Sequence, residues 1–279
     1  EILLYALKRS TENPEILPDR IYDEYISTRY GKKALEPVKN AFKKTYDIVL
    51  SSMYILGTNA AKHSSMDYDP YSSSYDRHVS GRWLEPPVVF VEHGINKEFH
   101  YWKDIINHIA PARFKTKDSR LGLEARYVID QNWVTPVELM DSLYLSYIIT
   151  EKRYGVSLAN EALADIERAK DLLNPSDYDD LYRLFKRTAL TAQLYEAVST
   201  AYFGFRIYAK GKSYRYENLE EQIRSALNRI DLVTDEMKGM QGGYPLGQWD
   251  WLKDAETALS YKNKILTGWK EYNNVKFTQ

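Results

Sequence analysis

Acidic and histidine side chains gather between residues 57 and 87, in a stretch without a helical pattern. Glycoside hydrolysis needs two carboxyl groups, one on each side of the glycosidic bond. A histidine nearby can transfer a proton near neutral pH. The candidates for such acid and base chemistry are Asp67, Asp76, Glu85, His63 and His78. Alternatively, the aspartates form turns in which their carboxylates accept hydrogen bonds from nearby backbone N–H groups.

Aromatic residues are the second unusual feature, with 24 Tyr and 6 Trp against 8 Phe. A Tyr or Trp ring has a flat apolar face and a polar edge, which suits a sugar ring as well as the edge of a protein core. Large rings on exposed connectors usually contact a ligand or another domain. We therefore predict carbohydrate binding or domain docking by rings in the connectors or next to them. These are Tyr68, Tyr71, Tyr75, Trp83, Trp102 and Trp249.

Other kinds of site lack their sequence patterns. There is no cysteine and no HExxH, and His100 and His108 are eight residues apart, too far for one metal ion. The sequence has no GxSxG motif for a nucleophilic serine. The glycines at 239–247 lack the Lys and Ser or Thr of a phosphate-binding loop. We expect no metal and no cofactor.

The composition indicates a folded protein. In a chain of 279 residues, 44% apolar residues are enough for a large core. The net charge is −1 and there is no basic block, so we expect no nucleic-acid partner. No apolar run approaches the roughly 20 residues that span a bilayer, so we expect no membrane partner.

Helical periodicity dominates the chain, and the sequence predicts an all-α antiparallel array or bundle of seven or eight helices. A repeat of about 34 residues, typical of tetratricopeptide stacking, is not found. We predict a helical segment over 1–115, with the loop at 57–87, and a helical bundle over 116–279, together one continuous domain. The expected helices are 18–31, 35–57, 97–109, 119–155 (restarting at Pro136), 157–173, 175–211, 216–237 and 249–272, and the one expected strand is 88–94.

Two expectations concern helix ends and faces. Gly31 and Gly155 are predicted to end helices, and Ser157 to begin the next one. The second predicted helix has apolar residues three and four apart, which we expect to face the core. They are Val38, Phe42, Tyr46, Val49, Met53 and Leu56.

Two stretches resemble a known family. LLYALKRSTENPEILPDRIYDEYISTRYG at 3–31 is similar to the point where the catalytic barrel passes into helices in bacterial alpha-glucuronidases that act on xylan. MYILGTNAAKHSSMDYDP at 53–70 is similar to their Met-Tyr-x-Leu-Gly stretch, although Thr58 and Asn59 replace the family's His-His pair. The resemblance covers roughly residues 1–110. The chain also begins inside an apolar run, so we expect a C-terminal piece of a longer protein.

The resemblance implies a non-catalytic, helical C-terminal module of a bacterial polysaccharide-degrading glycoside hydrolase. Such a module supports an N-terminal catalytic barrel of the same protein, helps to form a homodimer and sends loops toward a polysaccharide or oligosaccharide. It implies a secreted or periplasmic location. Two alternatives remain open: a free-standing carbohydrate-binding protein of the bacterial outer surface, and an enzyme that uses the acids at 57–87 itself.

Overall fold

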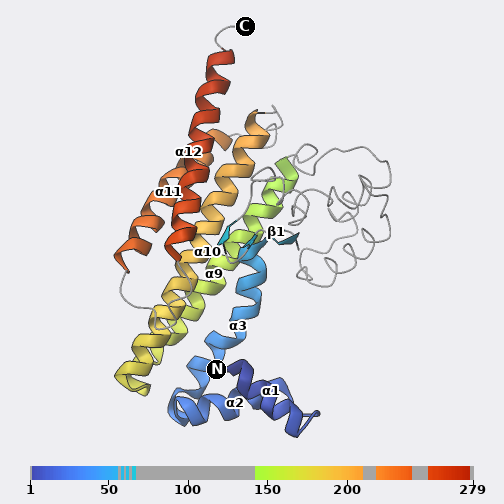
Figure 1. Cartoon of the computed structure of the whole chain (residues 1–279), viewed down its shortest axis with the longest axis vertical. Helices are drawn as coiled ribbons and strands as arrows, with labels where there is room; N and C mark the ends of the chain where they lie inside the picture. The colour runs from blue at the N-terminus through green and yellow to red at the C-terminus, as the bar shows by residue number, and fades with distance from the viewer. Residues whose placement is uncertain are drawn as a thin grey trace, which may run out of the picture. The chain divides into compact units, whose positions relative to one another are not determined.

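The computed structural model describes residues 2–55, 58–59, 61–62, 65–66, 142–209, 218–240 and 251–276. Seven α-helices dominate these ranges, which confirms the all-α prediction (Figure 1). They are α1 (Ile2–Glu12), α2 (Pro18–Arg29), α3 (Leu35–Met53), α9 (Ser142–Arg168), α10 (Pro175–Ala209), α11 (Leu219–Gly239) and α12 (Trp251–Lys276). Two short 3-10 helices, η1 (Lys32–Ala34) and η3 (Lys170–Leu172), lie in the connections.

Four short strands follow α3, where the sequence predicted a loop from residue 57. β1 (Tyr54–Ile55) pairs antiparallel with β2 (Thr58–Asn59), and β3 (Ala61–Lys62) pairs antiparallel with β4 (Ser65–Met66). Each strand has two residues, too few for an alternating pattern to be visible in the sequence. The predicted helices at 97–109 and 119–141, the strand at 88–94 and the boundary near residue 115 lie outside the described residues.

The chain divides into two compact units. Unit 1 comprises Glu1–Ile48 and Ser157–Ala189, and unit 2 comprises Val49–Val156 and Leu190–Gln279. Unit 1 therefore contains α1, α2, η1 and η3, together with parts of α3, α9 and α10. Unit 2 contains the four strands, α11, α12 and the remaining parts of those three helices.

In unit 1, helix ends follow their sequence signals. α2 begins with Pro18 at its first turn and ends before Gly31, whose φ of 89° favours glycine. Before α10, Asn174 Oδ1 accepts a hydrogen bond from the backbone N–H of Asp177 at 2.9 Å, the usual N-cap arrangement. The stop that we predicted at Gly31 is therefore confirmed.

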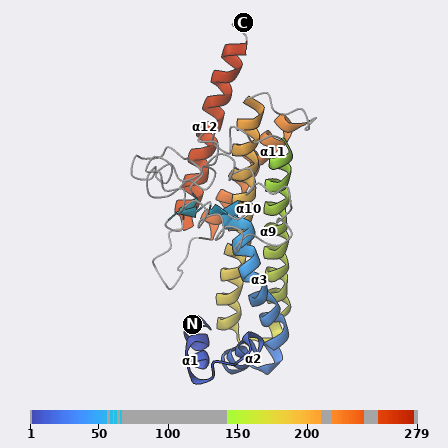
Figure 2. The ribbon, with the colours of Figure 1, turned by 90° about the vertical axis from the view of Figure 1, so that its right-hand side faces the viewer.

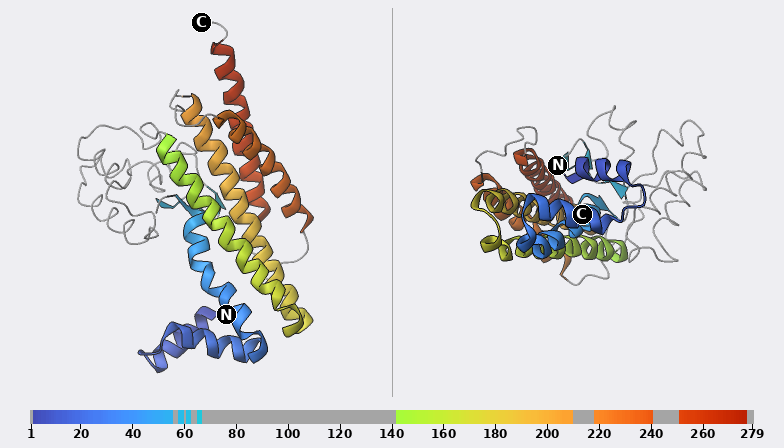
Figure 3. Two further views of the ribbon diagram at one scale, coloured as in Figure 1. Left: turned by 180° about the vertical axis from the view of Figure 1, so that it is seen from behind. Right: turned by 90° about the horizontal axis from the view of Figure 1, so that it is seen from below.

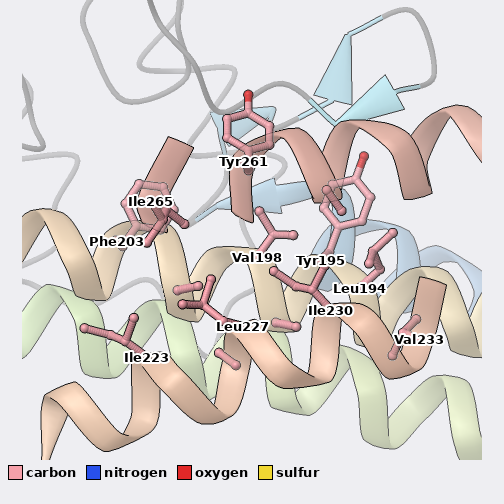
Figure 4. Packing of buried hydrophobic residues seen from close by; sticks show 14 of the residues in the cluster. Leu194, Tyr195, Val198, Phe203, Ile223, Leu227, Ile230, Val233, Tyr261 and Ile265 are labelled. Atoms are coloured by element: carbon pink, nitrogen blue, oxygen red, sulfur yellow. The ribbon is translucent and has the colours of Figure 1, made fainter. Parts of the chain in front are cut away.

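In unit 2, the core lies between the helices. The views from two sides show α11 and α12 alongside the later part of α10 (Figures 1 and 2), and α9 running antiparallel to α10 (Figure 3). The close-up shows buried side chains of α10, α11 and α12 pointing toward one another (Figure 4). Those labelled are Leu194, Tyr195, Val198, Phe203, Ile223, Leu227, Ile230, Val233, Tyr261 and Ile265.

Gly155 does not end a helix, contrary to our prediction, because α9 continues through it to Arg168. Glycine serves here for close approach: a Cβ at this position would lie 3.0 Å from Ser51 Cβ and 3.0 Å from Ser52 Oγ. Ser157 accordingly does not begin a helix. Its hydroxyl instead donates to Glu161 Oε1 at 3.1 Å within α9.

The predicted apolar face of α3 is also partly wrong. Tyr46 is 66% exposed and Val49 is 42% exposed, whereas Ala41 and Ile48 are buried. Each residue advances about 100° around a helix, so the eight steps from Val38 to Tyr46 make two full turns and about 80° more. Tyr46 therefore no longer points in the same direction as Val38. The buried face of α3 instead follows Val38, Ala41, Ile48 and Ser52. Small residues on this face hid it from an apolar pattern search.

Candidate functional site

None of the predicted site residues falls in the described ranges. The acid and base candidates Asp67, Asp76, Glu85, His63 and His78 lie outside them. So do the predicted carbohydrate-binding rings Tyr68, Tyr71, Tyr75, Trp83, Trp102 and Trp249. The structure does describe the end of α3, from which this part of the chain continues.

A buried lysine holds the carboxyl end of α3. Lys152 of α9 is 1% exposed, and its Nζ donates hydrogen bonds to the backbone oxygens of Ser51 at 2.7 Å and Ser52 at 3.0 Å. The last carbonyl groups of a helix have no partner within it and bear the negative end of the helix dipole. An ammonium group donates hydrogen bonds to these carbonyl oxygens and its positive charge offsets the negative end of the dipole. Lys152 is thus a C-terminal cap supplied by another helix.

The charge of Lys152 has a partner in the same turn of α9. Glu151 is fully buried, and its Oε2 lies 3.6 Å from Lys152 Nζ. Burial lowers the pKa of Lys152 to about 8, while the neighbouring Glu151 carboxylate opposes that shift. A perturbed lysine can indicate a catalytic group. Here the side chain is closed off from solvent and donates to backbone oxygens, which favours a structural role.

The burial of Lys152 has a signal in the sequence. Leu145, Ile148, Ile149 and Lys152 follow helical spacing on one face of α9, and all four are buried. A lysine in line with three apolar core residues can be buried only with a charge or carbonyl partner. Such a position predicts a buried cap or ion pair.

Another buried carboxylate in unit 2 joins three helices. Glu196 of α10 is 3% exposed and lies 2.5 Å from Arg229 Nη1 of α11 and 3.7 Å from Arg153 Nε of α9. With its oxygens held between two guanidinium groups, this carboxylate is suited to joining helices rather than to proton transfer.

An aromatic cluster near the surface of unit 2 includes the only tryptophan whose side chain is described. Trp269 of α12 stacks with Tyr208, at 5.1 Å between ring centroids, and with Phe205, at 5.4 Å. The Arg224 guanidinium lies 5.1 Å from the Trp269 ring centre, and Glu220 holds that guanidinium. Trp269 is 7% exposed, so its faces are occupied by protein. This ring packs rather than offering an open platform for a sugar.

Three of the described tyrosines also serve packing. Tyr25, Tyr195 and Tyr261 are buried. Figure 4 shows the hydroxyl groups of Tyr195 and Tyr261 on the side of the cluster away from α11. Of the two roles that the composition allowed, these rings have the core role.

Within the described ranges, no group of His, Asp and Glu side chains comes together that would hold a metal ion. None of the described helices is long and apolar enough to cross a membrane. No protein-family model, no curated protein and no solved structure matches the chain. The resemblance to alpha-glucuronidases therefore stays a prediction from two sequence stretches.

Proposed function

We propose that this chain is a non-catalytic helical module of a carbohydrate-active enzyme, in which the helices form a scaffold and residues 57–87 contact polysaccharide. The proposal includes the supporting role beside a catalytic domain of the same protein and a secreted or periplasmic location. It rests on the sequence for the sugar contact and on the helices for the scaffold.

The observation that most supports a scaffold is the pairing of buried carboxylates. Asp165 Oδ2 lies 2.7 Å from Lys44 Nζ, and Asp177 Oδ1 lies 2.6 Å from Arg29 Nη1, both within unit 1. Glu196 and Glu151 are paired with cations in unit 2. A buried carboxylate paired with a cation holds its neighbour in place, whereas a general acid needs access to substrate.

The sugar contact follows from the sequence. The rings predicted to bind carbohydrate are concentrated after the end of α3, and Lys152 fixes that end. A rigid support improves binding because less conformational entropy is lost when the ligand is bound. The scaffold and the aromatic segment therefore have complementary roles in this proposal.

Affinity electrophoresis against neutral and acidic plant polysaccharides tests the sugar contact. At least one polysaccharide should retard the chain, and Trp83→Ala should weaken that binding by about fivefold or more, since loss of one aromatic contact is worth roughly 1 kcal/mol. Tyr46→Ala is the matched control, because Tyr46 is an exposed ring on α3 outside the predicted set. Retardation by no polysaccharide would remove the sugar contact from the proposal.

Hydrolysis assays separate the module from an enzyme. The chain alone should release no reducing sugar from the polysaccharide that it binds. Turnover by the isolated chain, lost in Asp76→Asn or Glu85→Gln, would instead assign the chemistry to this segment. Hydrolysis of the bound polysaccharide by the natural full-length protein would support the module over the free-standing carbohydrate-binding protein.

A further inference from the structure

α3 stops earlier than its sequence predicts. The helical pattern extends past Met53 toward Gly57, yet the helix ends at Met53, and Tyr54–Ile55 form β1. β1 pairs with β2 through only two residues on each side. A pair of strands this short is marginal by itself. Something outside the local sequence must favour the strand over another helical turn.

The contacts of Lys152 supply that reason. In a continuing helix, the carbonyl of Ser51 would accept from the N–H of Ile55, and that of Ser52 from the next residue. In the structure, Lys152 Nζ donates to both oxygens, at 2.7 and 3.0 Å. These are the two oxygens to which a further helical turn would have to bring N–H groups. The ammonium and the extra turn therefore compete for the same two acceptors.

The packing around Lys152 fixes its position. Gly155, three residues later on α9, lets α3 approach so closely that a Cβ there would lie 3.0 Å from Ser51 Cβ. Glu151 places a carboxylate 3.6 Å from the ammonium. Lys152 is in addition 1% exposed, so water does not compete for the two carbonyl oxygens. The cap is therefore held in place by α9.

We propose that Lys152 is a conformational selector, which stops α3 at Met53 and holds Tyr54–Ile55 as a strand, so that loss of its bonds adds about one turn to α3. Residues in a strand rise about 3.3 Å each and helical residues about 1.5 Å. The selector therefore sets where and in which direction the chain leaves α3. It concerns the described residues 51–55 and 58–59 and does not depend on sugar binding.

The double variant Glu151→Gln/Lys152→Met tests the selector. Both side chains keep nearly the same size, and no lone charge remains buried. We expect the backbone carbon chemical shifts of Tyr54 and Ile55 in the full chain to change from strand-like to helix-like values. We also expect the Ile55 amide to exchange with solvent about tenfold more slowly, since a helical hydrogen bond replaces its pairing in a two-residue strand. Strand-like shifts in the folded double variant would overturn the proposal.

Two further variants complete the experiment. Lys262→Met is the matched control, because Lys262 of α12 pairs with Asp231 of α11 in the same unit, and residues 54–55 should remain a strand. Tyr54→Ala/Ile55→Ala keeps Lys152 and raises the local helix propensity. With Lys152 present, residues 54–55 of this variant should stay non-helical. A helix through residue 55 there would overturn the proposal, even if the first double variant does not fold.

Discussion

Units 1 and 2 are stabilised in different ways. In unit 2, large apolar side chains such as Leu194, Phe203 and Ile230 form one buried cluster. In unit 1, many of the buried residues of α9 and α10 are alanines, among them Ala159, Ala162 and Ala189. Small side chains bury little apolar area, and burial of apolar area contributes about 25 cal/mol per Å². Unit 1 must therefore depend more on other contacts.

Rings and ion pairs supply those contacts in unit 1. A continuous row of aromatic contacts, with ring centroids 5.5 to 6.4 Å apart, passes through α1, α2, α3 and α10. Its members are Tyr5, Tyr25, Tyr30, Phe42 and Phe185. Several ion pairs join the same helices, including Lys39 with Asp23 at 2.6 Å. We therefore expect core truncation to destabilise unit 2 more than unit 1, and high salt to destabilise unit 1 more than unit 2.

The largest effect is expected from truncating the core of unit 2. Phe203→Ala removes a fully buried ring of α10 and should lower the free energy of unfolding by about 3–5 kcal/mol. Urea denaturation followed by circular dichroism measures it. Leu232→Ala is the control, because Leu232 of α11 is 72% exposed, and its change should stay within about 0.5 kcal/mol. Equal effects of the two substitutions would contradict the cluster in Figure 4.

A smaller effect in unit 2 is the change of stability with pH that Lys152 causes. The folded chain gives up the Lys152 proton near pH 8, below the ordinary value of 10.5. Between pH 8 and 10.5 the unfolded chain binds more protons than the folded one at this position, so stability rises with pH. Relative to Glu151→Gln/Lys152→Met, the wild-type free energy of unfolding should increase by at most about 1.4 kcal/mol per pH unit.

Urea denaturation of both chains at pH 7, 8, 9 and 10 measures this difference. Leu232→Ala, which keeps Glu151 and Lys152, is the control and should keep the wild-type slope. A wild-type stability that falls relative to the double variant across this window would contradict the burial of an ammonium group at Lys152.

A further prediction concerns close packing in unit 2. Gly204 lies within α10, and a Cβ there would be 2.9 Å from Ile223 Cγ1 of α11. Gly204→Ala should destabilise by about 1 kcal/mol net, because the overpacking exceeds the gain in helix propensity. Gly239→Ala is the control, since no atom lies within 4 Å of its added Cβ. This second change should be neutral or stabilise by up to about 1 kcal/mol. Thermal unfolding compares the two.

The sequence predicted most helices of both units because their faces follow helical spacing. Helical spacing over 175–211 indicates an inward face of eight residues, of which Leu184 is only half-buried. The other seven are buried: Leu181, Phe185, Leu190, Leu194, Ala197, Val198 and Ala201. It failed where a tertiary contact decides the local structure. Gly155 looked like a helix stop but permits close packing. The last carbonyl groups of α3 accept hydrogen bonds from Lys152, which lies about 100 residues later in the chain. Neither effect is visible in a window of neighbouring residues.

The candidate site was predicted from residue types alone, and this is why it stays a prediction. Aromatic residues at 57–87 indicate sugar contact only if the rings are open, and residue type does not determine exposure. The described rings illustrate the point. Trp269 belongs to the residue type that suits sugars, yet its faces are covered by Tyr208, Phe205 and Arg224.

The smallest effect should come from the ion pairs of unit 1. Arg9 Nε lies 2.7 Å from Glu24 Oε2, and its Nη1 lies 2.7 Å from Glu12 Oε2. The hydrogen bonds and charge of Arg9 lower the pKa of Glu24, so this network is strongest when the carboxylates are ionised and salt is low. Arg9→Ala should lower the melting temperature slightly in dilute buffer. In 1 M salt, where the Debye length is about 3 Å, most of that difference should disappear, whereas the effect of Phe203→Ala should persist. An Arg9→Ala effect unchanged by salt would mean that its aliphatic stem packs against the neighbouring side chains, and unit 1 would then resemble unit 2 more closely than its ion pairs suggest.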